Sequence, residues 1–111
     1  MPNRHYLGEF EHIVVLALLR LSDLAYGVTV RQEIEVRTGR EVSIGAIYAT
    51  LARLETKGYV SSYLGGPTPE RGGRSKRFFR LTAKGVAAVN RTHRALHSMT
   101  EGLRLAGRYL Q

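Results

Sequence analysis

The sequence predicts a mainly α-helical fold with a small β-hairpin, and three observations predict it. Three stretches in the first half carry apolar side chains at steps of three and four residues, the period of a helix that buries one face. Two short runs of Tyr, Val and Phe then flank a segment rich in glycine and proline, the pattern of a hairpin. A last helical stretch follows, and 111 residues are a usual length for one domain.

Two helices open the chain. The first is expected from about Gly8 to Leu21, where apolar residues recur on one face. The turn "SDLAYG" ends it, and a second helix is expected from about Val28 to Thr38, with Val30 and Ile34 turned inward. Gly39 is expected to end this helix, because glycine readily takes the left-handed conformation that follows many helices.

The third helix is expected over residues 43–57. Ser43 suits its start, because the hydroxyl can accept from the free amides of the first turn, and Lys57 followed by Gly58 suits its end. The apolar face carries Ile44, Ile47, Leu51 and Leu54. The opposite face is small and nearly uncharged, with Ala46, Ala49, Thr50 and Arg53. A solvated helix face is usually charged, so this face is expected to meet a partner.

A hairpin and a long helix complete the order. The runs "YVSSYL" and "KRFFRLT" are expected to be strands, with Phe79 on one face and Phe78 on the other. The segment "GGPTPERGGRS" between them is expected to be a loop without regular structure, because of its glycines and prolines. Thr82 is expected to cap a final helix that reaches nearly to Gln111.

The charge is concentrated in the second half. The formal net charge is +8; residues 1–55 hold six Arg and Lys against seven Asp and Glu, whereas residues 56–111 hold eleven against two. A basic block in a small domain favours a polyanionic partner, most often nucleic acid, although a solubilising surface is the alternative. The block has no Leu, Phe and Trp face of the kind that lies on a membrane.

This order of elements is that of a winged helix-turn-helix, in which the second helix of the pair enters the major groove of DNA. On that helix we expect DNA contacts from Ser43, Gly45, Ala46, Tyr48, Thr50 and Arg53. Small side chains let the helix sit deep, and Gly45 lets a phosphate approach the free amides of the first turn. Ordinary capping remains the alternative for Ser43 and Gly45, and a half-buried core position for Tyr48.

The hairpin tip is the second expected contact. The wing, residues 65–76, carries Arg71, Arg74 and Lys76 beside paired glycines, so it can lie along the backbone or in the minor groove. Residues 1–81 would then form the DNA-binding unit and residues 82–111 a helix for dimerisation.

At this point the residues resemble a known family. "GAIYATLARLETKGYV" followed by "GGRSKRFFRLTAKG" is similar to the PadR-like transcriptional regulators, as are "LGEFEHIVVLALL" and "AYGVTV". The resemblance runs from Leu7 to about Gly85, with two aromatic Phe where the family often has tyrosines and Ser75 where proline is common. It implies a dimeric transcriptional regulator that binds duplex DNA. It also implies the shorter type of family member, which has only one helix after the wing.

The last helix is expected to pair with a second copy. Its apolar line reads Val89, Leu96, Leu103 and Leu110, the spacing of a two-helix seam. The resemblance implies dimers built from the first and last helices, with small apolar ligands between them in some members. On this ground an effector pocket is expected near Phe10, Val14 and Met99, although a filled interface is the alternative.

Other functions have weaker support. The chain has no cysteine, no catalytic motif and only one Asp, so an enzyme is not expected. His93 and His97 stand four apart, but no partner ligand is near in sequence, so neither a metal nor a cofactor is expected. The longest apolar run has seven residues, too short to cross a membrane, and a cytoplasmic protein is expected. An RNA-binding or ribosome-associated protein, or a winged helix that binds proteins, remain the alternatives.

Overall fold

The computed structural model describes residues 6–67 and 75–103. Its elements, in chain order, are α1 (Glu9–Leu21), the short 3-10 turn η1 (Ser22–Leu24), α2 (Gly27–Thr38), α3 (Ile44–Thr56), β1 (Val60–Pro67), β2 (Ser75–Leu81) and α4 (Ala83–Thr100). The expected order of three helices, a hairpin and a further helix is confirmed. This is a mainly helical winged helix.

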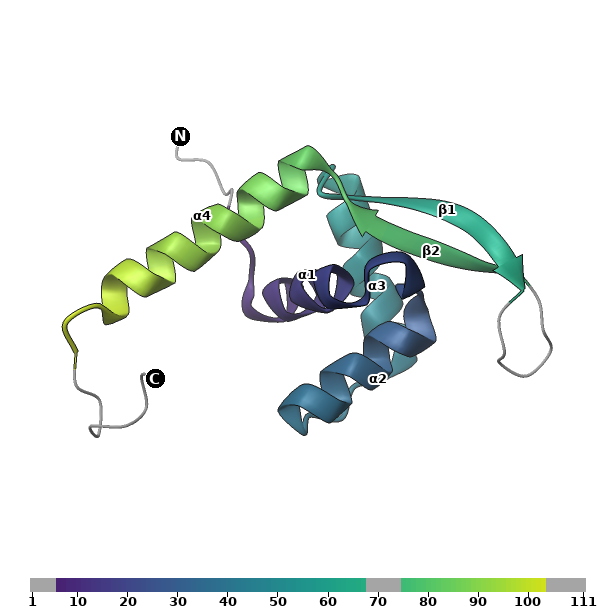
Figure 1. Cartoon of the computed structure of the whole chain (residues 1–111), viewed down its shortest axis with the longest axis horizontal. Coiled ribbons are helices and arrows are strands. Elements are labelled where there is room, and N and C mark those ends of the chain that lie inside the picture. The colour runs from purple at the N-terminus through teal and green to yellow at the C-terminus, as the bar shows by residue number, and fades with distance from the viewer. Residues whose placement is uncertain (1–5, 68–74, 104–111) are drawn as a thin grey trace.

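Three helices form the body of the molecule, and the hairpin and α4 leave it in opposite directions (Figure 1). The core lies where α1, α2 and α3 meet and continues under the base of the hairpin. Its fully buried side chains include Val14 and Val15 of α1, Val30 and Ile34 of α2, and Ile47, Leu51 and Leu54 of α3. The apolar faces predicted for all three helices are therefore the ones that pack.

The helix ends follow the expected local chemistry. Gly39 has φ +71° and ends α2 in the left-handed conformation, and Gly58, with φ +81°, does the same after α3. Thr82 caps α4, since its hydroxyl accepts from the amide of Gly85 at 3.1 Å. That same hydroxyl donates to the Gly58 carbonyl at 2.6 Å, so the start of α4 is tied to the end of α3.

The hairpin is longer than expected. β1 and β2 pair antiparallel from Val60 opposite Leu81 to Leu64 opposite Arg77, and the register then shifts to Pro67 opposite Ser75. The expectation that the segment starting at Gly65 has no regular structure is thus wrong for its first three residues. The reason is a contact between the two strands: a side chain at Gly65 would collide with the ring of Phe78, so glycine allows the strand to continue past that ring.

The last helix is shorter than expected. α4 ends at Thr100, where the Glu101 amide donates to the His97 carbonyl at 2.9 Å. Gly102 follows with φ +84°, the left-handed conformation that stops a helix. The expectation of one continuous helix is therefore wrong at residues 101–103, and residues 104–111 lie outside the described residues. None of the described helices is long and apolar enough to cross a membrane.

Candidate nucleic-acid interface

The first turn of α3 is open to solvent. The Ser43 hydroxyl accepts from the Ala46 amide at 3.0 Å, as expected of an N-cap. Gly45 is exposed, and a Cβ placed there would have only the Ser43 hydroxyl within 4 Å, at 3.9 Å. A negatively charged group can therefore approach the positive end of the helix dipole without meeting a side chain at Gly45.

The exposed face of α3 consists of small side chains. Its buried positions are Ile47, Thr50, Leu51 and Leu54, so the middle of the outer face lies directly opposite them. That midline reads Gly45, Ala49, Ala52 and Thr56, at steps of four, three and four residues, and all four are exposed. Ala46 and Arg53 lie on one flank of this line and Tyr48 on the other. Ala52 and Thr56 were not among the sequence-predicted contacts, although the phase of the apolar residues indicates them.

One expected position on this face is wrong. Thr50 is only 2% exposed and belongs to the buried side of α3. It follows Ile47 by three residues and precedes Leu54 by four, which places it on the same helix face as both. Its hydroxyl accepts from Arg53 Nη2 at 3.2 Å, so it contributes to the site only by holding that arginine.

Arg53 is held by α1 as well. Its Nε lies 3.9 Å from the Glu11 Oε2, and Lys57 Nζ lies 2.8 Å from the same oxygen. Glu11 also accepts from the Gly8 amide at 2.9 Å and is itself buried. Burial alone raises the pKa of the Glu11 carboxyl, but the hydrogen bonds from Lys57 and Gly8 and the charges of Lys57 and Arg53 outweigh it and lower this pKa below its ordinary value.

Tyr48 lies across the start of α2. A Cβ built on Gly27, the first residue of α2, would collide with the Tyr48 ring and hydroxyl. The absence of a side chain at Gly27 thus makes room for this ring. Tyr48 is nevertheless 44% exposed, so part of this side chain is open to solvent at the junction of α2 and α3.

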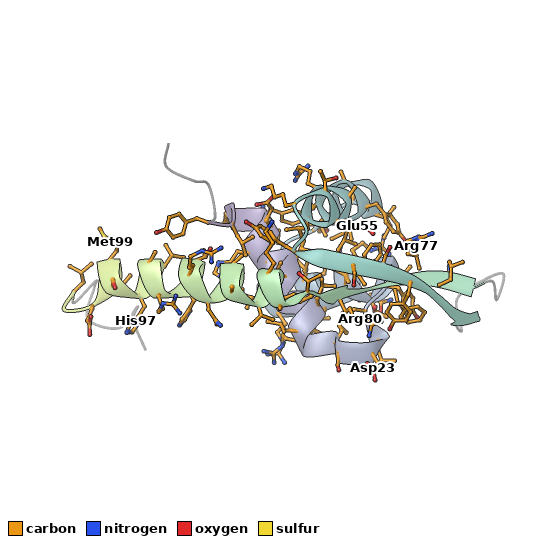
Figure 2. The ribbon with its side chains drawn as sticks, turned by 90° about the horizontal axis from the view of Figure 1, so that it is seen from above. Asp23, Glu55, Arg77, Arg80, His97 and Met99 are labelled. Carbon is orange, nitrogen blue, oxygen red and sulfur yellow. The ribbon has the colours of Figure 1, made fainter. Side chains whose placement is uncertain are left out.

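The basic residues of β2 alternate between the two faces of the hairpin. Arg77 donates to the Ser62 hydroxyl at 3.0 Å, and this hydroxyl donates to Glu55 of α3 at 2.8 Å. Arg80 faces the other way and lies 4.6 Å above the Tyr63 ring. Figure 2 shows Arg77 beside Glu55 on the α3 side, and Arg80 on the opposite side.

Sequence reasoning missed the position of Arg77. The alternation of side chains along a strand indicates this position, because Arg77 is two residues from the buried Phe79 and so shares the helix-facing side of the strand. Lys76, which was expected to contact DNA, is half-buried and alternates to the face of Arg80. Arg71 and Arg74 lie outside the described residues.

The expected dimer line along the last helix is only partly exposed. Val89 is 6% exposed and packs in the core of its own chain, together with Ala88. Its expected place in an interface between copies is therefore wrong, because α1 and the base of the hairpin already cover the first half of α4. Leu96 is exposed on the second half, and Leu103 is exposed beyond the helix end. Leu110 lies outside the described residues.

The expected effector residues do not come together. Val14 is fully buried in the core, and the ring of Phe10 lies under the Arg40 guanidinium at 5.1 Å. Met99 projects from the far end of α4, on the side away from His97 (Figure 2). A cleft of about 490 Å³ does lie between α1 and α4. Its lining comes from the segment before α1 and from α1 and α4 themselves, and includes Tyr6, Leu7, His12, Ile13, Leu16 and Leu96.

One histidine, His12 of α1, lines this cleft. Burial lowers the pKa of His12 below its ordinary value, and the charge of His93 on α4 lowers it further. The rings of His93 and His97 stack with centroids 6.1 Å apart. Within residues 6–67 and 75–103, no group of three or more His, Cys, Asp or Glu side chains could hold a metal ion.

The model of the PadR-like family of transcriptional regulators matches residues 15–91, which is most of the chain. The chain belongs to this family. Its winged helix, with α3 as the second helix of the pair, is therefore the DNA-binding fold of PadR-like transcriptional regulators.

Solved structures agree with the family assignment. The RosR protein of Halobacterium salinarum is 26% identical, with a TM-score of 0.67 over 87% of this chain and 80% of that one. A PadR-like transcription factor from Bacteroides fragilis is 21% identical, with a TM-score of 0.68 over 83% of this chain and 84% of that one. A PadR family regulator from Eggerthella lenta is 22% identical, with a TM-score of 0.64 over 93% and 87%. These last two show the fold alone. No curated protein is significantly similar in sequence.

Proposed function

We propose that this PadR-like protein is a dimeric repressor that binds a palindromic operator, with α3 in the major groove and the wing on the adjoining backbone or minor groove. The observation that carries the proposal is the outer midline of α3. Its small side chains, from Gly45 to Thr56, allow close approach to base edges, while Arg53 stands on the flank and Arg77 beside the helix. With chromosomal DNA as the partner, we also propose a cytoplasmic location.

The position of Arg77 supports this arrangement. If α3 occupies the major groove and the wing tip the next minor groove, the sugar-phosphate strand between the two grooves must pass the junction of α3 and the hairpin. Arg77 lies at that junction, held through Ser62 to Glu55. We therefore assign it a phosphate contact, in addition to the contacts proposed for Arg71 and Arg74.

The exposed apolar side chains support a dimer. Leu16 and Leu19 of α1 and Leu96 and Met99 of α4 are all exposed, on the two helices that flank the cleft. A second copy covering them would remove this apolar surface from water, which is favourable. In this proposal residues 1–81 bind DNA and the segment 82–111, with α1, holds the dimer.

Sedimentation of a Leu16→Asp, Leu96→Asp double variant tests the dimer. Charges in a desolvated interface are costly, so we expect a monomer. Val36→Asp is the matched control, because Val36 is 84% exposed on α2 and outside this surface. A double variant that sediments like the wild type would place the interface elsewhere.

The cleft between α1 and α4 supports a small apolar effector. Its volume is in the range of ligand pockets, and Leu7, Ile13 and Leu16 give it apolar walls. Such a ligand changes DNA binding only if its affinity differs between free and DNA-bound protein. Planar aromatic compounds should therefore be titrated into both forms. Equal affinity for both would exclude a switch, and no binding to either would indicate a closed interface.

Selection from random DNA duplexes is the experiment that tests the function itself. We expect a palindromic consensus, and an affinity that falls with salt by roughly 0.9 log units per log unit for each phosphate contacted. Tighter binding to single-stranded RNA at matched salt would favour the RNA-binding alternative. If no nucleic acid binds, a protein-interaction module becomes the better account.

The two arginines of β2 provide an internal control. Arg77→Ala should weaken binding to selected and random duplexes alike and lower the salt slope by about one. Arg80→Ala removes the same charge from the same strand, but on the face away from α3, so its effect should be small. Equal losses for the two variants would mean that only net charge matters. Arg53→Ala should instead cost about 1–3 kcal/mol on the selected site alone.

A further inference from the structure

The Glu11 carboxylate joins the first helix to the helix that we place in the groove. Glu11 is 8% exposed, and its Oε2 is 2.8 Å from Lys57 Nζ and 3.9 Å from Arg53 Nε. Its other oxygen accepts from the Gly8 amide at 2.9 Å. A buried carboxylate needs such partners, because an unpaired charge away from water is costly. The carboxylate is thus fixed in place from both sides.

Arg53 is held at two points by groups that do not move easily. One is the fixed Glu11 carboxylate, and the other is the hydroxyl of the buried Thr50, which accepts from Arg53 Nη2 at 3.2 Å. The side chain is nevertheless 56% exposed. A free surface arginine samples many rotamers, whereas these two contacts favour one orientation of the guanidinium and leave its outer edge open to solvent.

We propose that Glu11 is a positioning residue for DNA recognition: without touching DNA, it fixes the guanidinium of Arg53 in the orientation that reads a base. The inference rests on the proposed function, in which Arg53 contacts the operator. It assigns part of the sequence discrimination to α1, a helix outside the helix-turn-helix pair. It also explains why a basic protein keeps a buried carboxylate beside two cations of its DNA-binding surface.

The proposal predicts opposite effects on two kinds of DNA. Glu11→Gln keeps the size of the side chain but removes its charge, so Arg53 and Lys57 are no longer neutralised. Non-specific DNA should then bind slightly more tightly and with a steeper salt dependence, because both cations become available to phosphates. The selected duplex should bind about tenfold more weakly relative to random duplex, since Arg53 loses its orientation.

A matched control is available on α2. Glu33 also pairs with two arginines, accepting from Arg20 Nε at 3.2 Å and Arg37 Nε at 2.9 Å, and it too bridges two helices. None of these residues lies on α3. Glu33→Gln makes the same change in charge and should leave the preference for the selected duplex unchanged.

A double-mutant cycle with Arg53→Ala tests whether Glu11 acts through Arg53. In the Arg53→Ala background, Glu11→Gln should no longer alter the ratio of selected to random affinity. A purely structural role would instead lower both affinities and the stability in either background. Thr50→Val removes the other anchor of Arg53 without changing a charge, and supplies a second test that does not depend on the folding of Glu11→Gln. Thr50→Val should also reduce the ratio of selected to random affinity.

The result that overturns the proposal is a ratio unchanged by Glu11→Gln, or a loss that persists in the Arg53→Ala background. If Glu11→Gln does not fold, a ratio unchanged by Thr50→Val overturns it. Failure of the proposed function gives a different result. In that case the wild-type protein itself would prefer no duplex, and the assignment of Glu11 would be wrong with it. The ratio of selected to random affinity of the wild type is therefore measured first, because it separates failure of the proposed function from failure of the role assigned to Glu11.

Discussion

Substitution by alanine should change the stability of the protein in opposite directions at two helix glycines. Gly85 of α4 packs directly on the backbone at the end of α3, and a Cβ there would collide with the Tyr59 carbonyl oxygen. That carbonyl accepts from the Thr82 amide at 3.0 Å, so the clash is with fixed backbone and no rotamer change relieves it. Gly45 of α3, in contrast, has open space around it.

The magnitudes follow from two competing terms. Alanine in a helix gains about 1 kcal/mol over glycine. Forcing an extra methyl group into a packed site costs about 1–3 kcal/mol, and contact with backbone favours the upper part of this range. Gly85→Ala should therefore lose about 1–2 kcal/mol of unfolding free energy, or about 4–8 °C in Tm for a domain of this size. Gly45→Ala should be neutral or gain up to about 1 kcal/mol.

The functional effect should be the reverse at Gly45. If a DNA phosphate approaches the first turn of α3 there, the added methyl group stands in its path, and affinity for the selected duplex should fall about tenfold, or about 1.4 kcal/mol. Urea denaturation at one fixed protein concentration and fluorescence anisotropy with labelled duplex measure the two quantities. Unchanged DNA affinity for Gly45→Ala would refute the approach of DNA at this turn. A loss of stability as large as that of Gly85→Ala would refute the packing argument.

Three further predictions concern stability. The pKa of Glu11 is lower in the folded protein than its ordinary value of 4.5, so its contribution to the free energy of unfolding is complete above pH 4.5 and is lost as the pH falls through the folded pKa. The urea midpoints of wild type and Glu11→Gln should therefore converge at acid pH. The pKa of His12 is also lowered, so stability should decrease as the pH falls from about 6.5, and His12→Gln should reduce this dependence in urea titrations at several pH values. Leu54→Ala, at a fully buried site, should cost about 2–5 kcal/mol by denaturant titration at constant slope.

Local chemistry explains which parts of the fold were predictable. The N-caps at Ser43 and Thr82 and the left-handed glycines at Gly39 and Gly58 are decided within a few residues, and all four are as the sequence indicates. The extension of β1 was not predictable in this way. It depends on the Phe78 ring lying over Gly65, a contact between two strands that residue types alone do not reveal.

The candidate site was predictable in its location but not in every side chain. The small polar side chain of Thr50 favours the outer face of α3. Its position three residues after Ile47 instead places it on the buried face, where it is 2% exposed. The spacing of apolar residues on the last helix predicts Val89 in a seam between two copies, and the family resemblance leads to Val14 in an effector pocket. Both are instead buried within the chain. For Val89 of α4 the burial depends on how α4 packs on α1, and this packing is set by the geometry of the hairpin base. That geometry is a property of the whole fold.

The placement of three consecutive residues on α1 gives the proposed effector a short route to DNA. Successive residues of a helix point about 100° apart, so Glu11, His12 and Ile13 face different neighbours. Glu11 contacts Arg53 and Lys57 of the DNA-binding surface, while His12 and Ile13 line the cleft with α4. A ligand that widened this cleft by turning α1 would displace the Glu11 carboxylate by the same rotation. Coupling on the order of 1–3 kcal/mol therefore requires only the rigidity of one helix, not a chain of contacts through the core.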